Sequence, residues 1–281
     1  MDFEVIADTK GVEKFSFSKL NAFHQCRYAY DLCYNKHQHG IPNGFGQIGT
    51  EVHSILEKYG NGELLQFELV DKFLEEFDEA IPKGVRLYFA NGSYRDLTES
   101  YKKQCVKFLS DWNGFDGLEI IGTEEEFSVL LRIKDKCLFL NGFIDVIAVD
   151  ENGDYYIIDY KSKSAFKSKE EVMEYARQLF LYSIWAKRKY GKYPKYLWFF
   201  QFRINHIEKI DFSEEKLEEV LEWVYETLCQ IENEQFWLPI SFDGLDKKEL
   251  DNETFYCRNL CDFRMVCPYW KEALGIEEQK E

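Results

Sequence analysis

Two aspartates and a lysine are the residues of this chain best placed to do chemistry. Asp145 ends an apolar segment, and Asp159 and Lys161 lie two positions apart in the next one. Because side chains two apart on a β-strand point to the same face of the sheet, Asp159 and Lys161 should face together. If the two segments pair as strands across the turn at Asn152 and Gly153, Asp145 should lie near Asp159.

Two carboxylates held together beside apolar surface indicate a bound cation, because their repulsion and lost hydration would otherwise be costly. Carboxylate oxygens favour hard ions such as magnesium or manganese. An ion held by Asp145 and Asp159 could polarise a phosphodiester and activate water. Lys161 could orient or help deprotonate that water, or stabilise charge on the phosphorus oxygens. Taken alone, an Asp-x-Lys pattern is more often a salt bridge between strand ends.

Three further residues could complete such a site. His53 follows Gly49 by about one helical turn, and a neutral imidazole is a common metal ligand. The glycine would allow the helix to pack closely against the sheet. Gln178 and Tyr182 are four apart on an expected helix, so they share a face and could hold Lys161 or a phosphate. In isolation, His53 would more often be a core residue, and ordinary packing would account for Tyr182.

Three cysteines near the end of the chain indicate a second ligand set. Cys257, Cys261 and Cys267 have the spacing Cys-x₃-Cys-x₅-Cys and are followed by proline. A four-thiolate site needs one more cysteine, and the candidates are Cys26, on an aromatic-rich N-terminal helix, and the other four cysteines of the chain. The other cysteines are Cys33 and three in apolar helix or strand patterns, which we expect in the core: Cys105, Cys137 and Cys229.

The spacing of the cysteines does not identify the metal. A cubane iron–sulfur cluster and a tetrahedral zinc ion would both accept four thiolates. Either would join the two ends of the chain, and closing so long a loop would stabilise the fold by restricting the unfolded chain. A structural role is therefore sufficient, and electron transfer is not required.

Composition indicates a folded protein inside the cell. Of 281 residues, 45% are hydrophobic and 17% aromatic, which suits a packed core. No apolar run reaches the ~18 residues that would span a membrane, and the N-terminus lacks the pattern of a signal peptide. We therefore expect a cytoplasmic protein, in which eight cysteines are unsuited to a disulfide framework.

Charge argues against a nucleic-acid partner only when it is summed over the whole chain. The net charge is −16, from 35 basic and 51 acidic residues. The stretch from Ile157 to Arg203 nevertheless holds eleven Lys/Arg and four Asp/Glu. One basic face on an acidic body could bind a phosphate backbone, although a solvated surface helix explains the same charges equally well.

Periodicity and turn residues predict the elements that would position these side chains. Alternating apolar residues predict strands, apolar residues at helical spacing predict helices, and Ser18 and Ser213 are expected as helix caps. The predicted helices are 18–34, one beginning near Gln47, 169–190 and 213–235, and the predicted strands are 123–133, 137–149 with a break at Gly142, 155–160, 195–203 and 206–212.

This order of elements predicts an α/β fold, a small mixed sheet with helices on its faces. We expect a single domain over residues 1–281. The acidic segment 62–118 would be a helical insertion, and segments 18–34 and 251–270 would form the cysteine region.

Six short motifs, each weak alone, occur in the order found in one family. The sequence resembles the RecB-type branch of the PD-(D/E)XK nucleases, and within it the CRISPR-associated and AddB-type members that carry a 4Fe–4S cluster. The resemblance covers Ser16 to Trp270 apart from the acidic helical stretch. The motifs are Ser18-x-Leu20-x-x-Phe23-x-x-Cys26, Gly49-x-x-x-His53, Gly142-Phe-Ile-Asp145, Asp159-Tyr-Lys161-Ser162, Gln178-Leu-x-Leu-Tyr182 and the cysteine trio.

The resemblance implies a role for each site residue. It implies a PD-(D/E)XK restriction-endonuclease-like core with a terminal iron–sulfur clip. The metal, magnesium or manganese, would be bound by His53, Asp145, Asp159 and the backbone carbonyl of Tyr160, and Lys161 would be the catalytic lysine. The supporting pair would be Gln178 and Tyr182, and the 4Fe–4S ligands would be Cys26, Cys257, Cys261 and Cys267.

The chain departs from the family pattern in the cysteine region. Three residues rather than the usual two separate Cys257 from Cys261, and Arg27 stands where a proline often follows the first cysteine. These departures concern the geometry of the cluster. The catalytic set shows none.

We therefore predict a metal-dependent DNA exonuclease that acts on single-stranded ends. One alternative is a non-cleaving DNA-binding subunit of a DNA-processing complex with protein partners, and another is a redox sensor that uses the cluster. CRISPR adaptation, recombinational repair and viral DNA processing would all accommodate such an enzyme. The sequence leaves cutting polarity and oligomeric state open.

Overall fold

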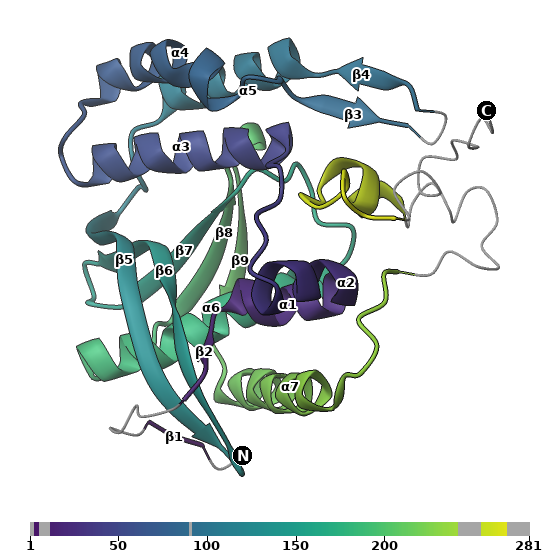
Figure 1. Ribbon diagram of the computed structural model, residues 1–281. Helices are drawn as coiled ribbons and strands as arrows, with labels where there is room; N and C mark the ends of the chain where they lie inside the picture. Colours follow the sequence, from purple (N-terminus) through teal and green to yellow (C-terminus); the bar gives the residue numbers. More distant parts are fainter. Residues whose placement is uncertain (1–2, 6–11, 90–91, 241–253, 269–281) are drawn as a thin grey trace, which may run out of the picture.

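The computed structural model describes residues 3–5, 12–89, 92–240 and 254–268, and a mixed sheet lies at its centre (Figure 1). The strand order is β1-β5-β6-β7-β8-β9, with β2 also paired to β6. The pairs β7–β8 and β2–β6 are parallel, and the others are antiparallel. The strands are β1 Phe3–Val5, β2 Lys14–Phe15, β5 Leu118–Ile133, β6 Lys136–Asp150, β7 Tyr155–Lys161, β8 Tyr196–Gln201 and β9 His206–Asp211.

Helices cover both faces of the sheet, as the sequence predicted for an α/β fold (Figure 1). One face packs against α1, α6 and α7, and the other packs against α3, α4 and α5, so two apolar cores flank the sheet. The helices are α1 Phe17–Gln25, α2 Arg27–Tyr30, the π-helix Asp31–Asn35, α3 Gly44–Gly60, the 3₁₀ turn Gln66–Glu68, α4 Leu69–Ala80, α5 Thr98–Asp111, α6 Lys169–Tyr190, the 3₁₀ turn Phe202–Ile204 and α7 Glu214–Asn233.

Helices α6 and α7 confirm the predicted helices 169–190 and 213–235. Each begins at a serine whose side chain caps the helix. The hydroxyl of Ser168 accepts the amide of Glu171 at the start of α6, and Gly191 ends that helix in the left-handed region. Ser213 caps α7 in the same way, through the amide of Lys216. Hydroxyl caps and a terminal glycine are features that a sequence displays directly.

The N-terminal helix differs from the prediction at its cap and in its length. Ser16, not Ser18, is the cap, since its extended backbone places the hydroxyl 3.1 Å from the amide of Lys19. The helix also breaks at Cys26, which adopts an extended conformation between α1 and α2. The predicted continuous helix 18–34 is therefore wrong, and the break lies at the cysteine that we predicted as a ligand.

The strands β5 and β6 are longer than predicted and form one long hairpin. β5 begins at Leu118, and β6 continues through Gly142 without a break. Gly142 serves packing instead, because a β-carbon there would lie 2.9 Å from the ring of Phe127. In β5, Glu124 has a positive φ of 44°, where the hairpin bends beside Asp145.

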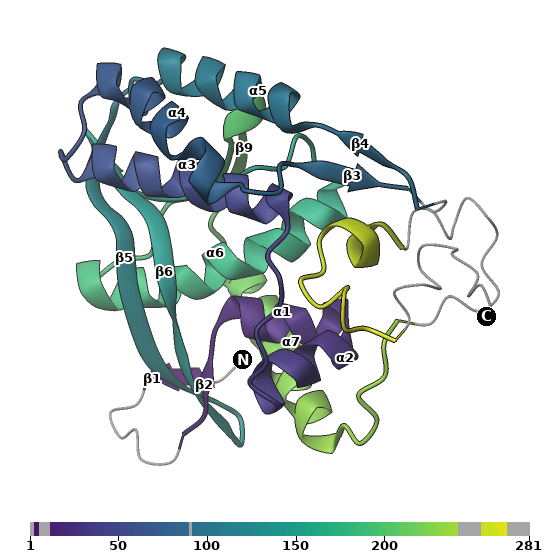
Figure 2. The same cartoon turned by 45° about the horizontal axis from the view of Figure 1, so that its top comes forward.

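The acidic insertion is not wholly helical, which corrects the prediction for 62–118. Between α4 and α5 it contains a two-stranded hairpin, β3 Arg86–Tyr88 and β4 Tyr94–Asp96. Its helices share one apolar core with α3 and the sheet. Figure 2 shows α4 and α5 above α3 and the hairpin reaching toward the segment 254–268. The amide of Tyr88 donates to Asn259 of that segment at 2.7 Å.

The start of α3 gives a test of this packing. A β-carbon at Gly44 would lie 2.1 Å from the carbonyl oxygen of Gly84, whereas one at Gly46 would meet only Asn43 at 3.7 Å. We expect Gly44→Ala to destabilise the protein by about 1–3 kcal/mol. Gly46→Ala should be neutral or stabilising, by up to ~1 kcal/mol. Urea unfolding of both variants measures the difference, and equal midpoints would contradict the close approach.

Candidate active site and cysteine cavity

The strands β6 and β7 separate at the position of the two aspartates. Their ladder ends at Val146 and Ile158, so Asp145 and Asp159 do not continue it. Instead, the Asp145 carboxylate accepts the backbone amide of Tyr160 at 2.7 Å. The expected proximity of the two aspartates is found, but the strands open at this point. We call the place where this ladder ends, at Asp145 and Asp159, the opening.

His53 reaches the opening from α3. Its Nε2 atom lies 3.0 Å from the carbonyl oxygen of Tyr160, and its Nδ1 atom lies 3.5 Å from Asp145. Burial lowers the pKa of His53, so the imidazole is neutral near pH 7, which is the form that binds metal. A β-carbon at Gly49 would meet Ser162 at an ordinary 3.5 Å. The predicted need for glycine at that position therefore has no steric support.

Glu124 joins this site, and the sequence analysis missed it. Its carboxylate lies 3.9 Å from His53, and the ligand atoms of His53, Glu124 and Asp145 all lie within 4.8 Å of one another. Burial, with the charge of Asp145 second, raises the pKa of Glu124 to about 7. It is the first of three consecutive glutamates, and only the backbone bend at its positive φ distinguishes it from the other two.

The two predicted aspartates occupy different environments. Burial, with the charge of Asp159 second, raises the pKa of Asp145 well above its usual value. Asp159 is 2% exposed, lies outside the group of three ligand atoms, and pairs with Lys161 at 2.7 Å. Two carboxylates in so dry a position favour a cation between them.

Lys161, Gln178 and Tyr182 form a connected row, as their spacing predicted. The Lys161 ammonium donates to the Gln178 side-chain oxygen at 3.2 Å, and the Gln178 amide donates to the Tyr182 hydroxyl at 2.6 Å. Burial alone would lower the pKa of Lys161, but the carboxylate of Asp159 outweighs it and raises the pKa. Lys161 is therefore a fixed cation beside Asp159.

The donor set at the opening fits a divalent metal ion. One imidazole and two carboxylates converge, with Asp159 and the Tyr160 carbonyl alongside. Oxygen donors with one neutral imidazole suit manganese or magnesium better than a soft ion.

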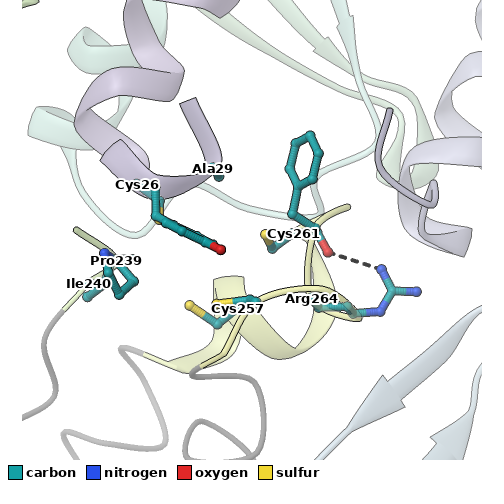
Figure 3. Close-up of a pocket in the computed structure, with 10 residues that line it drawn as sticks. Cys26, Ala29, Pro239, Ile240, Cys257, Cys261 and Arg264 are labelled. Atoms are coloured by element: carbon teal, nitrogen blue, oxygen red, sulfur yellow. Dashed lines mark hydrogen bonds between the residues drawn. The ribbon is translucent and has the colours of Figure 1, made fainter. Parts of the chain in front are cut away.

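The four predicted cysteine ligands line one cavity at the junction of α2 and the segment 254–268. Figure 3 shows Cys26, Cys257 and Cys261 at this cavity, and Cys267 also lines it. The cysteines come from opposite ends of the chain. Burial, with the neighbouring thiols second, raises the pKa of Cys257 to about 12. Burial also raises the pKa of Cys261, to about 11. Within the described ranges, no three cysteine sulfurs all lie within 4.8 Å of one another.

The remaining cysteines divide into core and surface positions. Cys105 is buried, as predicted, and Cys229 is half-buried. Cys137 is exposed, so its predicted core position is wrong, because it lies at the outer end of the β5–β6 hairpin. Cys33 is half-buried and does not line the cavity. Parts of the predicted cysteine region, residues 251–253 and 269–270, fall outside the described residues.

Comparison with known proteins places the chain in a broad context. The family model described as the PD-(D/E)XK nuclease superfamily matches residues 14–268. No curated protein matches the sequence. A similar solved structure, "Crystal structure of SSO0001", has 14% sequence identity and a TM-score of 0.34, and the match covers 61% of this chain and 78% of the other. In the parts described, no helix is both long and apolar enough to cross a membrane.

Proposed function

Because the chain belongs to the PD-(D/E)XK nuclease superfamily, we propose that it is an exonuclease that hydrolyses single-stranded DNA from an end. The observation that carries the proposal is the opening between β6 and β7, where His53, Glu124 and Asp145 bring three ligand atoms together beside Lys161. A bound magnesium or manganese ion supplies Lewis-acid activation of the phosphodiester and of the attacking water.

The residues around the opening have different roles in the proposed reaction. A bound ion would be held by His53, Asp145, Asp159 and the Tyr160 carbonyl, with Glu124 as a further ligand. Lys161 stabilises the charge that develops on the phosphate oxygens, since its raised pKa makes it a poor base. Gln178 and Tyr182 keep the ammonium in place.

An end-labelled strand tests the proposal. With manganese or magnesium, the protein should degrade linear but not circular single-stranded DNA, and a chelator should stop the reaction. Lys161→Ala should lower the rate by about 10²–10³-fold, the usual effect of removing one transition-state donor. Lys167→Ala, at an exposed position in the following loop, is the matched control. Cleavage by Lys161→Ala at the wild-type rate would refute the mechanism.

We also propose that the cysteine cavity holds a 4Fe–4S cluster. Four thiolates would also bind a zinc ion. We prefer the cluster because the cysteine pattern resembles that of family members that carry a cubane, in which each sulfur binds a different iron. The raised pKa values mean that binding would release protons from the thiols.

Within the superfamily, we propose that the chain belongs to the RecB-type branch, near the AddB-type and CRISPR-associated members. Such an enzyme would work in the cytoplasm within a DNA-processing complex. The insertion supports a protein partner, because its acidic surface also exposes Leu65, Phe67 and Leu74. Exposed apolar side chains that lie together often mark an interaction surface.

A further inference from the structure

A groove between α1, α6 and α7 contains an arginine that forms no salt bridge within the described part of the chain. These helices pack against one another on the face of the sheet that carries Lys161 (Figure 2). One end of the groove is lined by side chains from all three, and Arg177 and Trp223 also line its continuation along α6 and α7. Arg177 is half-buried, and no carboxylate among the described residues pairs with it.

Trp223 and its neighbours hold Arg177 in a defined position. The guanidinium carbon lies 4.7 Å from the centre of the Trp223 ring. His24 packs on the same indole at 5.4 Å and is fixed by Thr227 at 2.8 Å. Burial lowers the pKa of His24, so the imidazole adds no second cation. The guanidinium thus lies over the indole, and its N–H groups have no acceptor among the residues that the structure describes.

The polar side chains around Arg177 leave it available to a ligand. Glu171 is paired with Lys163 at 2.7 Å. Glu174 is exposed, and although its charge acts on Arg177, the two form no salt bridge in the described part of the chain. Asn21 and Gln25 of α1 line the groove as additional hydrogen-bonding groups. A half-dry guanidinium without an acceptor favours an anion, and its planar fork matches phosphate geometry.

Tyr175 contacts both the groove and Lys161 of the proposed active site. Tyr175 lines the groove, and its ring lies 5.7 Å from the Lys161 ammonium. A strand with one phosphate at Lys161 would therefore pass Tyr175 to reach Arg177, two residues along the same helix. A cleft recessed between helices suits one flexible backbone better than a duplex.

We propose that this groove binds the single-stranded DNA substrate beyond the scissile phosphate, with Arg177 as the phosphate ligand. Trp223 is a positioning residue that holds the guanidinium. The inference rests on the proposed function, since it assigns the path of the same substrate.

Binding of labelled oligo-dT to the full chain in chelator, where no cleavage occurs, tests the groove. Arg177→Ala should weaken binding about 10- to 100-fold, the value of a charge-assisted hydrogen bond. It should also reduce the salt slope of the binding constant by about 0.7, the value for one phosphate contact on a single strand. Trp223→Ala should weaken binding less, and Trp223→Phe should restore it. Arg188→Ala, an exposed arginine on the same helix, should change nothing.

The outcomes separate this inference from the proposed function. If Arg177→Ala binds oligo-dT as wild type while Lys161-dependent cleavage persists, the groove is wrong and the nuclease stands. If the wild type binds but does not cleave, and Arg177→Ala still weakens binding, the proposed function fails and the groove stands. An equal loss for a blunt duplex would overturn the preference for a single strand. In cleavage assays, Arg177→Ala should raise KM and leave kcat unchanged.

Discussion

Replacing Asp145 with asparagine is expected to abolish cleavage and, at the same time, to stabilise the metal-free protein. The carboxylate is 11% exposed, lies 3.5 Å from His53 and is near a second carboxylate, Asp159. Loss of this ligand removes the metal's contribution to the transition state, which is several kcal/mol, so the rate should fall at least ~10³-fold. An asparagine oxygen can still accept the Tyr160 amide, so the local fold is retained.

The stability of the metal-free protein should depend on pH through the same residue. Because the pKa of Asp145 is raised on folding, the folded state binds this proton more tightly than the unfolded state. The stability that the protonated carboxyl provides is complete below the unfolded pKa of about 3.9 and is lost as pH rises through the folded value. Asp145→Asn cannot lose that proton, so its advantage over wild type should grow from pH 4 toward neutrality.

Thermal unfolding with and without manganese measures both effects. Wild type should gain stability on adding the ion, because the ion binds only the folded state. Asp145→Asn should begin with the higher midpoint and gain much less. Asp211→Asn, at an exposed strand end, is the matched control and should behave as wild type. If Asp145→Asn has a lower unfolding midpoint than wild type in chelator, the carboxylates of Asp145 and Asp159 do not destabilise the metal-free fold by repelling each other.

The parts of the site that follow from local periodicity could be predicted from the sequence. Spacing by two on a strand and by four on a helix places Asp159, Lys161, Gln178 and Tyr182 correctly, because backbone geometry fixes which side chains share a face. Ser168 and Gly191 likewise bound α6, since caps act through neighbouring backbone groups.

The parts that depend on departures from regular structure could not be predicted. Glu124 enters the site through a backbone bend that no residue type in its neighbourhood requires. The separation of β6 from β7 at Asp145, before Val146, has no local cause in the sequence either. In the insertion, the helical pattern concealed the hairpin of β3 and β4, whose short strands lack a clear alternation. Tertiary packing decides these features.

Replacing a cavity cysteine is expected to have a large effect on stability. Cys261→Ser should remove a 4Fe–4S cluster and its absorbance near ~400 nm. In the chain-entropy model, a link that closes a 100-residue loop stabilises by about 4.7 kcal/mol, and the loop from Cys26 to Cys257 is longer. For a protein of this size that loss corresponds to a fall in Tm of roughly 10–20 °C.

The control for this substitution is Cys33→Ser. Cys33 packs against the small apolar cluster that contains Cys261 and does not line the cavity. It is the other candidate ligand near the N-terminus. The Cys33→Ser variant should keep the absorbance near ~400 nm and a thermal unfolding midpoint near that of wild type. If the anaerobically purified protein contains zinc and lacks this absorbance, the cavity binds a single zinc ion and not an iron–sulfur cluster.

The cavity cysteines lie apart from the opening between β6 and β7. The Cys261→Ser protein that remains folded should therefore still cleave DNA at low temperature. Loss of cleavage with the fold intact would instead assign the cluster a part in catalysis.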